Sequence, residues 1–293
     1  MRRWQRLARS ARTELYRRRP RLVMAAAAAA TGAAVLVAVL APAAPGAARL
    51  AVRLAAAVHT LGLKAHKAAA TRPRGAPAGG AAAIGTLFTS PPGSLPAGGH
   101  FCTASVVDSP AGDLVMTAAH CVSGLTPSQF VFVPGYQNGK APYGVWSVSR
   151  VIVDQAWSTA ASPDDDVAFL VVDKPGTTAS VQSITGGERL GVGQPAGQLV
   201  QVTGYPNGAG TPISCLNRAV LFSPTQLEFD CDGYANGTSG SPLLADVDPF
   251  TGLGTVIGVI GGYQQGGDTS SVSYADRLEA NVATLYKLAT SQP

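Results

Sequence analysis

From Ile84 onward, short apolar runs alternate with polar turns along the chain. Runs of this length, bounded by Gly, Pro, Asn and Asp, are typical of β-strands. We predict strands over residues 84–88, 101–107, 114–119, 130–133, 145–153, 167–172, 198–204, 215–222, 226–231, 242–244 and 255–262. Only residues 277–288 show helical spacing, with Leu278, Val282, Leu285 and Leu288 on one face. Many short strands without a βαβ alternation favour an all-β protein built as antiparallel barrels or a sandwich.

The N-terminal part has a different pattern. Residues 1–21 are strongly basic, and the stretch from Leu22 to Leu40 carries no charge. Small residues follow, with Ala41 and Ala43 at the spacing that signal peptidase accepts. We therefore predict a signal peptide within residues 1–46, which implies secretion. An uncleaved membrane anchor is the competing interpretation, because about 20 apolar residues suffice to cross a bilayer.

Residues 47–81 are rich in Ala, Pro and Gly, with scattered bases. This composition predicts a linker, and a removable propeptide is the alternative. Residues 82–293 are then left as the folded domain. The protein is expected to be a monomer, and to be tethered to a membrane if the N-terminal segment is retained.

Composition and charge agree with a turn-rich secreted domain: the chain has 34 Gly and 21 Pro, and only 13% of its residues are charged. The net charge of +5 conceals an asymmetry, because residues 1–75 hold 15 of the 22 Lys and Arg but a single acid, Glu14. The rest of the chain therefore has seven bases and 16 acids, a net charge of −9. That balance repels phosphate, so no nucleic-acid partner is expected.

All four cysteines lie in the folded part, and an even number behind an export signal predicts two disulfides. Three pairings are open; pairing nearest neighbours joins Cys102 to Cys121 and Cys215 to Cys231. Each bond would close a loop of about 20 residues, worth about 3 kcal/mol in the chain-entropy model. A zinc site is the competing interpretation, which the lack of Cys-x-x-Cys spacing and of clustered His disfavours. No metal and no cofactor are predicted.

Ser239 is the candidate nucleophile, in the stretch Gly-Thr-Ser-Gly-Ser-Pro at residues 237–242. Flanking glycines let a serine hydroxyl stand exposed and leave unhindered N–H groups for a developing oxyanion. A general base and an acid that orients it are also needed for this chemistry, and His120 and Asp166 are the candidates. His120 follows an apolar strand and precedes Cys121, which would clamp a general base.

Asp166 opens the apolar strand VAFLVV, so its carboxylate can be partly buried and can orient a histidine. The preceding Asp164 and Asp165 are predicted to lie in a solvated turn. His100 is the other histidine of the folded part, and we predict a structural role for it.

The flanks TAAHC, DVAFL and GTSGSP, in the order His120, Asp166, Ser239, resemble those of chymotrypsin-like (trypsin-fold) serine peptidases, in particular the secreted bacterial branch. The resemblance covers about residues 82–290. It implies two six-stranded antiparallel β-barrels followed by a C-terminal helix. It also fits the sequence His100-Phe101-Cys102, because relatives often carry the disulfide partner of the cysteine after the histidine there.

The resemblance further implies the role of each residue. Ser239 would attack a peptide bond of a protein or peptide substrate, His120 would carry the proton, and Asp166 would orient His120. The N–H groups of Gly237 and Ser239 would form the oxyanion hole. Animal relatives have an aspartate before the serine, which pairs with a new N-terminal amine on activation. Thr238 stands there in this chain, so that switch cannot operate.

Specificity is predicted from the positions around the substrate pocket. Trypsin-type relatives carry an acid six residues before the serine, where this chain has Gly233, flanked by Asp232 and Tyr234. Gly233 argues against a preference for Lys or Arg, and Asp232 leaves that alternative open. Gly261, Gly262 and Tyr263 are expected to form the pocket wall. We predict a preference for a small or medium apolar residue before the scissile bond.

Three other functions compete with an active peptidase. A catalytically inactive binding module of the same fold is the first, although all three triad positions are filled. An esterase of the α/β class is the second, but its serine precedes a helix, and here Pro242 and an apolar run follow Ser239. A membrane-tethered structural protein is the third, and it leaves the motifs of the folded part unexplained.

Overall fold

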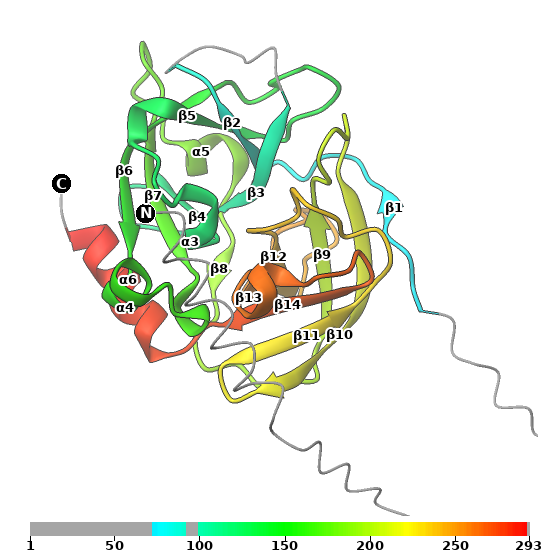
Figure 1. Cartoon of the computed structure of the whole chain (residues 1–293). Helices are drawn as coiled ribbons and strands as arrows, with labels where there is room; N and C mark the ends of the chain where they lie inside the picture. The colour runs from blue at the N-terminus through cyan, green and yellow to red at the C-terminus, as the bar shows by residue number, and fades with distance from the viewer. Residues whose placement is uncertain (1–71, 92–98, 292–293) are drawn as a thin grey trace, which may run out of the picture. The chain divides into compact units, whose positions relative to one another are not determined.

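The computed structural model describes residues 72–91 and 99–291, all within the compact unit Ala68–Pro293. The strands form two barrels that follow one another along the chain (Figure 1). The first barrel contains β2 (Ile84–Thr89), β3 (His100–Val106), β4 (Leu114–Thr117), β5 (Phe130–Pro134), β6 (Trp146–Val153) and β7 (Ala168–Asp173). These strands pair antiparallel in the closed order β2-β3-β4-β7-β6-β5.

The second barrel contains β9 (Leu199–Gly204), β10 (Ile213–Ser223), β11 (Gln226–Asp230), β12 (Pro242–Ala245), β13 (Thr255–Ile260) and β14 (Val272–Arg277). It closes because β10 pairs with both β11 and β9, while β11, β14, β13, β12 and β9 pair in succession. Two short strands are added to this ring. β1 (Ala76–Pro77) pairs with β10, and β8 (Arg189–Leu190) runs parallel to β13. The prediction of two six-stranded antiparallel barrels is confirmed.

The barrels are filled from the apolar runs that predicted the strands. Phe130, Phe132, Trp146 and Phe169 are buried in the first barrel, and Phe229 is buried in the second. Large aromatic side chains bury the most apolar surface per residue, so these positions contribute strongly to both cores.

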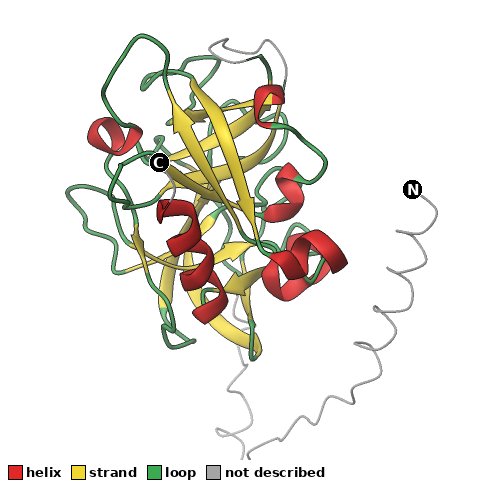
Figure 2. Cartoon of the chain, turned by 90° about the vertical axis from the view of Figure 1, so that its left-hand side faces the viewer, coloured by secondary structure: helices red, strands yellow, loops and turns green. Residues whose placement is uncertain are grey.

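The described helices are α3 (Ala119–Val122), α4 (Gln155–Ala160), α5 (Val181–Thr185) and α6 (Ala280–Ser291), with 3-10 turns η1 (Pro127–Gln129), η2 (Pro163–Asp165) and η3 (Tyr263–Gly266). Figure 2 shows α6 lying against the barrels. Its partner is the first barrel, because Tyr286 donates a hydrogen bond to the carbonyl of Asp108 at 2.8 Å.

The prediction that only the chain end is helical was wrong. Helices α3, α4 and α5 have four to six residues, too few to show a helical period. The predicted start of the last helix was also wrong, because residues 272–277 form β14. That strand mixes small and polar residues and has no apolar alternation. The buried face of α6 consists of Val282, Leu285 and Ala289, whereas Leu288 is 49% exposed.

Residues 72–80, here called the strap, run along the second barrel, although the sequence placed them in the linker (Figure 1, cyan). The Gly75 N–H donates to Asp232 O at 2.8 Å, and the Asp232 N–H donates to Pro73 O at 2.9 Å. Arg72 adds ion pairs to Asp230 and Asp232 at 3.8 and 3.9 Å. The described part of the chain therefore packs from its first residues onward.

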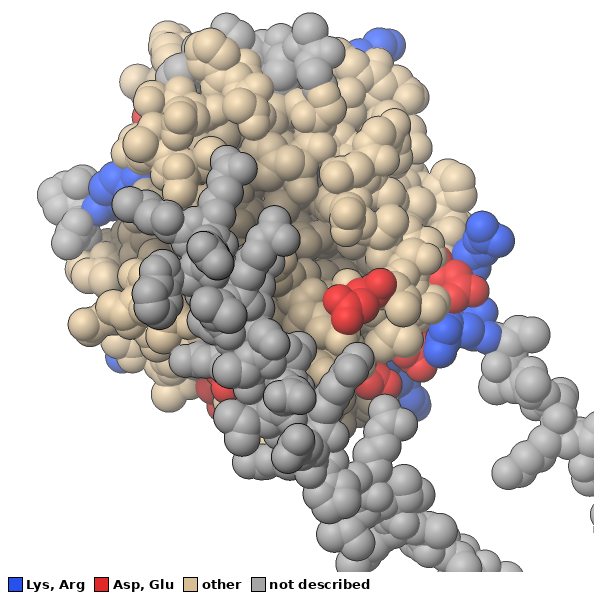
Figure 3. Space-filling view, in the orientation of Figure 1, with Lys and Arg blue, Asp and Glu red and all other residues tan. Residues whose placement is uncertain are grey.

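The predicted signal segment and the rest of the predicted linker lie outside the described residues. No helix among residues 72–91 and 99–291 is long and apolar enough to cross a membrane. In the face shown in Figure 3, the described surface is mostly uncharged; several acidic and basic side chains lie near one another at the right of the view, and other basic side chains stand singly at the edges. This face carries no extended basic patch among the described residues.

Candidate active site

His120 and Asp166, which the sequence placed in one constellation, are in direct contact. His120 lies in α3, directly after β4, and Asp166 ends the turn before β7. The carboxylate of Asp166 accepts from the His120 backbone N–H through Oδ1 and contacts His120 Nδ1 through Oδ2, each at 2.7 Å. β4 and β7 are neighbours in the first barrel, so one pair of strands delivers both groups.

The burial of the pair differs between its members. The Asp166 side chain is fully buried, whereas that of His120 is 14% exposed. An ionised carboxylate can only accept, so His120 Nδ1 is the donor, and in the neutral imidazole Nε2 keeps a lone pair. The imidazole is thereby held in the tautomer that a general base requires.

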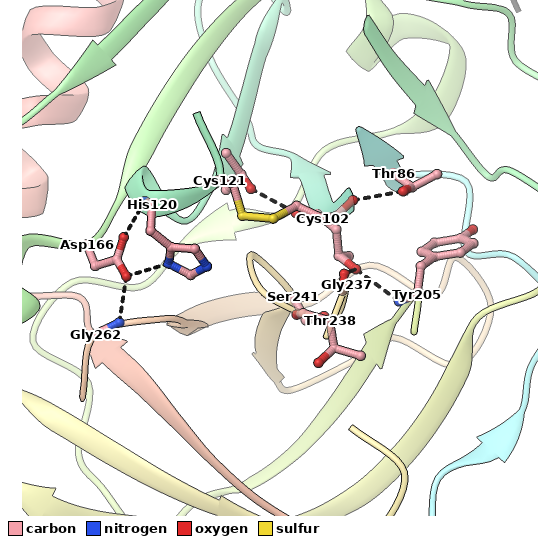
Figure 4. The surroundings of a disulfide bond; sticks show 12 residues. Thr86, Cys102, His120, Cys121, Asp166, Tyr205, Gly237, Thr238, Ser241 and Gly262 are labelled. Carbon is pink, nitrogen blue, oxygen red and sulfur yellow. Dashed lines mark hydrogen bonds and ion pairs between the residues drawn. A yellow bond between two sulfur atoms is a disulfide. The ribbon is translucent and has the colours of Figure 1, made fainter. Parts of the chain in front are cut away.

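The second barrel completes the shell of Asp166. The Gly262 N–H donates to Asp166 Oδ2 at 2.9 Å (Figure 4). A Cβ on the neighbouring Gly261 would lie 3.1 Å from the same oxygen, so the carboxylate fits tightly against this turn. Hydrogen bonds of this kind compensate for the loss of water around a buried carboxylate. Gly261 and Gly262, predicted as pocket wall, thus also contact the acid of the pair.

Both disulfides predicted by nearest-neighbour pairing are present. Cys102 is bonded to Cys121 and Cys215 to Cys231, with Cα–Cα distances of 6.2 and 6.7 Å. The first bond joins β3 to α3 next to His120 (Figure 4). Cys102, His120 and Cys121 lie close together, but cysteines bind zinc as thiolates, and these two sulfurs are bonded to each other.

The serine loop, residues 235–241, has a backbone that requires glycine at two positions. Gly237 has φ +97° and Gly240 has φ +85°, a region that other residues rarely adopt. A Cβ on Gly237 would come within 2.6 Å of Asn207 N and Tyr205 O. A Cβ on Gly240 would collide with Thr103 O and Thr117 Oγ1 of the first barrel. The loop therefore lies against the strands that lead to His120.

The serine loop also contains its own hydrogen bonds. Thr238 donates to Ala235 O through both its N–H and its hydroxyl, at 3.2 and 2.8 Å. Ser241 donates to Thr238 O through its N–H and its hydroxyl, at 3.0 and 2.6 Å. Thr238 is buried, and its partner lies within the same loop. Thr238, which stands where animal relatives carry an aspartate, thus forms its hydrogen bonds within the serine loop.

Ser239 is partly exposed, and its carbonyl accepts from the Thr103 N–H at 2.8 Å. Within the described residues, no hydrogen bond joins its side chain to His120. A Cβ on the adjacent Gly240 would lie 3.2 Å from Ala118 N, which places the loop beside the segment carrying His120. The backbone N–H groups of Gly237 and Ser239 have no acceptor in the described part of the chain.

The predicted pocket residues have different surroundings. Gly233 has φ +106°. The Tyr234 side chain is buried in the second barrel, where its hydroxyl donates to Val202 O at 2.6 Å and its ring packs on Phe229. This side chain faces the core of the second barrel.

Tyr263 lies in η3, because β13 ends at Ile260 instead of continuing to residue 262. Its ring packs against Phe222 and Tyr274, with centroid distances of 5.1 and 4.9 Å. Glycines at 261 and 262 end the strand, since Gly262 has φ +72°. The strand predicted over residues 255–262 therefore ends at Ile260 and is followed by a turn, and the pocket wall at these residues stays a prediction.

The prediction of a solvated turn at Asp164 and Asp165 was wrong. Both are half-buried: Asp164 accepts from the Thr225 hydroxyl at 2.7 Å, and Asp165 accepts from Asn281 at 2.9 Å. The partners come from the second barrel and from α6, which a local sequence pattern does not reveal.

Sequence reasoning missed Gln226 and Asp276, which lie behind the pair. Gln226 Nε2 donates to Asp276 Oδ1 at 2.7 Å and to Pro163 O at 2.8 Å. Burial, and then the charge of Asp166, raise the pKa of Asp276 well above its ordinary value. Asp276 belongs to β14, the strand that the apolar pattern did not predict. Asp276 would have been identified as a candidate if residues 272–277 had been predicted as a strand, because an acid within a buried strand is unusual.

His100 has the surroundings of a structural residue. It is buried, its Nε2 bonds to Ala209 O at 3.0 Å, and its ring packs against Phe88 and Tyr205. Burial lowers its pKa below the ordinary 6.5. These contacts support the structural role predicted for it.

Residues 88–279, more than half of the chain, match the family described as Trypsin. The chain belongs to this family. Trypsin zeta of Drosophila erecta is 40% identical over 62 residues, covering 21% of this chain and 22% of that protein. The chain thus matches only about a fifth of the length of this curated relative.

Solved structures share the fold. Protease Anisep from Arthrobacter nicotinovorans has a TM-score of 0.62 and 23% identity, covering 74% of this chain and 99% of that one. The thermostable serine protease AL20, from an extremophilic microorganism, has a TM-score of 0.60 and 24% identity, covering 73% and 99%. A Glu endopeptidase has a TM-score of 0.60 and 15% identity, covering 76% and 99%. At this identity, the similarity establishes the fold alone.

Proposed function

We propose that this protein is a secreted serine endopeptidase that hydrolyses peptide bonds through Ser239, His120 and Asp166. The observation that carries the proposal is the His120–Asp166 pair, with a buried carboxylate on Nδ1 and a lone pair left on Nε2. Membership of the Trypsin family supports it. The proposed substrates are proteins and peptides, and no step in the mechanism calls for a metal or cofactor.

In the proposed reaction, the Ser239 hydroxyl attacks the scissile carbonyl and His120 Nε2 takes its proton. His120 then gives that proton to the leaving amine, which produces an acyl-enzyme, and water repeats the sequence to release the acid. Asp166 holds His120 in place throughout and stabilises the imidazolium. The N–H groups of Gly237 and Ser239 receive the developing oxyanion, a role supported by their lack of acceptors in the described residues.

Activation is proposed to need no new N-terminal amine near the serine. Thr238 holds the serine loop through Ala235, so the loop contains its own anchor. If residues upstream of the strap are removed on maturation, we infer that their removal unblocks the protein and does not complete the site.

Secretion is proposed from the basic, apolar and small-residue order of residues 1–46, and the bacterial branch from the resemblance of the flanks TAAHC, DVAFL and GTSGSP. Retention as a membrane anchor is the alternative outcome. For specificity, Gly233 at the position six before the serine argues against a preference for Lys or Arg. We propose a small or medium apolar residue before the scissile bond.

Labelling with a fluorophosphonate, followed by a fluorogenic peptide panel, tests the proposal. Labelling of the parent but not of Ser239→Ala is expected, with Ser183→Ala, a change at an exposed serine, as the matched control. A folded parent that neither labels nor cleaves would establish the inactive binding module instead. Cleavage mainly after Arg, Lys or Glu would overturn the specificity alone.

A further inference from the structure

Thr103 connects the serine loop to the first barrel. It lies in β3, next to Cys102, and its side chain is fully buried. Its hydroxyl donates to Gly237 O at 3.0 Å and accepts from the Tyr205 N–H at 2.9 Å. Its N–H donates to Ser239 O at 2.8 Å. Figure 4 shows this contact region between the disulfide and the serine loop.

These bonds belong to a series that fixes four successive carbonyls of the serine loop. The Asn236 carbonyl accepts from the Asn207 N–H at 2.7 Å, and the Thr238 carbonyl accepts from Ser241. The remaining two, of Gly237 and Ser239, are both held by Thr103. Because each peptide is planar, a fixed C=O also fixes the N–H on its other side. The Asn236 and Thr238 carbonyls therefore set the directions of the N–H groups of Gly237 and Ser239. The two carbonyls held by Thr103 fix the peptide that lies between these N–H groups and the peptide that follows them.

The chemistry of the side chain suits this position. Tyr205 N–H is only a donor and Gly237 O is only an acceptor, so the group between them must accept and donate at once. A hydroxyl does both, whereas a methyl does neither. The backbone carbonyl of Thr103 in turn accepts from the Thr117 hydroxyl at 2.8 Å, in the strand that leads to His120.

We propose that Thr103 is a positioning residue of the peptidase: its hydroxyl holds the Gly237–Thr238 peptide, which lies between the two oxyanion donors, so that the donors keep their direction relative to each other. The proposal rests on the proposed function. Thr103 acts through the serine loop and does not touch substrate. Its loss should therefore lower the rate of the chemical step and leave ground-state binding of the peptide unchanged.

The test compares Thr103→Val, which keeps the shape and removes the hydroxyl, with Thr103→Ser, which keeps the hydroxyl. Thr86→Val is the matched control, because Thr86 is also fully buried and its hydroxyl donates to Cys102 O at 2.8 Å, one residue away from Thr103. Removing a direct oxyanion donor lowers kcat by about 10²–10³-fold, so we expect about 10–100-fold for Thr103→Val, with KM unchanged.

A second readout separates positioning from a general loss of stability. Affinity for a peptide aldehyde, which forms a tetrahedral adduct, should fall with kcat, while affinity for the matching peptide acid should not change. Thr103→Ser should retain most of the rate, and Thr86→Val should keep kcat despite a lower unfolding midpoint. If Thr103→Val does not fold, Thr103→Ser and Thr103→Ala give the same comparison, since they differ only by the hydroxyl.

Two failures are distinguishable. A parent that neither labels with fluorophosphonate nor cleaves any peptide would overturn the proposed function. An active parent whose Thr103→Val variant keeps the kcat and aldehyde affinity of Thr86→Val would overturn the role of Thr103 alone.

Discussion

The two barrels contribute to the candidate site in different ways. The first barrel supplies side chains: His120 and Asp166 meet at 2.7 Å, next to the Cys102–Cys121 disulfide. The second supplies Ser239 on a loop whose backbone depends on positive φ at Gly237 and Gly240 and on a series of bonded carbonyls. The His120–Asp166 pair should lose its function when a functional group is changed, whereas the serine loop should lose its conformation when a side chain is added to a glycine. Substitutions in the two barrels should therefore fail differently.

The largest effect is expected from changing the functional group in the first barrel. Asp166→Asn should lower kcat by about 10⁴-fold without unfolding the protein, because an amide nitrogen facing His120 Nδ1 favours the wrong tautomer. Initial rates on a peptide substrate and circular dichroism would measure this. Asp164→Asn is the control, since Asp164 bonds to Thr225 and not to His120. A fully active Asp166→Asn would remove Asp166 from the mechanism.

The second barrel should fail through shape. Gly240→Ala would combine a positive φ with a collision against Thr103 and Thr117, and we expect a loss of at least about 3 kcal/mol of unfolding free energy, with loss of activity. Gly124→Ala is the matched control, because Gly124 has φ +78° and nothing within 4 Å of its Cβ position. That variant should lose only about 1 kcal/mol. Urea unfolding compares the two, and equal losses would show that the collision is relieved.

The segment between the barrels should respond to pH. Glu188 is fully buried and accepts from the Gly254 N–H at 2.6 Å, while its backbone bonds to Val106 and Asp108. Burial, opposed in part by that hydrogen bond, raises the pKa of Glu188 from 4.5 to about 7. The native state then binds more protons than the unfolded state between these pH values. The contribution of protonated Glu188 to the free energy of unfolding is therefore complete below pH 4.5 and is lost as the pH rises through 7.

Glu188→Gln removes this titrating group from the segment between the two barrels. A pKa shift of this size corresponds to about 3 kcal/mol. From pH 5 to pH 8, the unfolding free energy of the variant should therefore rise relative to that of the parent by up to this amount. Urea midpoints at the two pH values would measure it. Asp173→Asn, a change at an exposed acid, should leave the parent's pH dependence unaltered. A parallel pH dependence in parent and Glu188→Gln would contradict the assignment.

The smallest effect is expected at the strap. The ion pairs of Arg72 with Asp230 and Asp232 are long and well exposed, so Arg72→Ala should lose less than about 1 kcal/mol, and less still at high salt. Thermal unfolding at two salt concentrations checks this. A much larger loss would show that the ion pairs, and not the backbone bonds of Gly75 and Asp232, hold the strap.

The fold was largely predictable because most strands are short apolar runs with clear turns between them. β14 escaped because small and charged residues interrupt its few apolar positions, and because its burial comes from pairing with β11 and β13 on either side. The strap escaped for a related reason. Its Pro and Gly residues are typical of a linker, yet its hydrogen bonds go to residues 212 and 232, far along the chain.

The sequence by itself determined the candidate chemistry: which serine, histidine and aspartate stand in specific flanks, and which cysteines are neighbours. Local patterns are enough to find these residues, because each one is recognised from the few residues on either side of it. Only the tertiary structure decided what surrounds those groups. It placed Gly262 on Asp166, buried Tyr234 in the core, and brought Thr103 to the serine loop. These contacts join residues more than 30 positions apart, and packing between strands, which no single segment encodes, creates them.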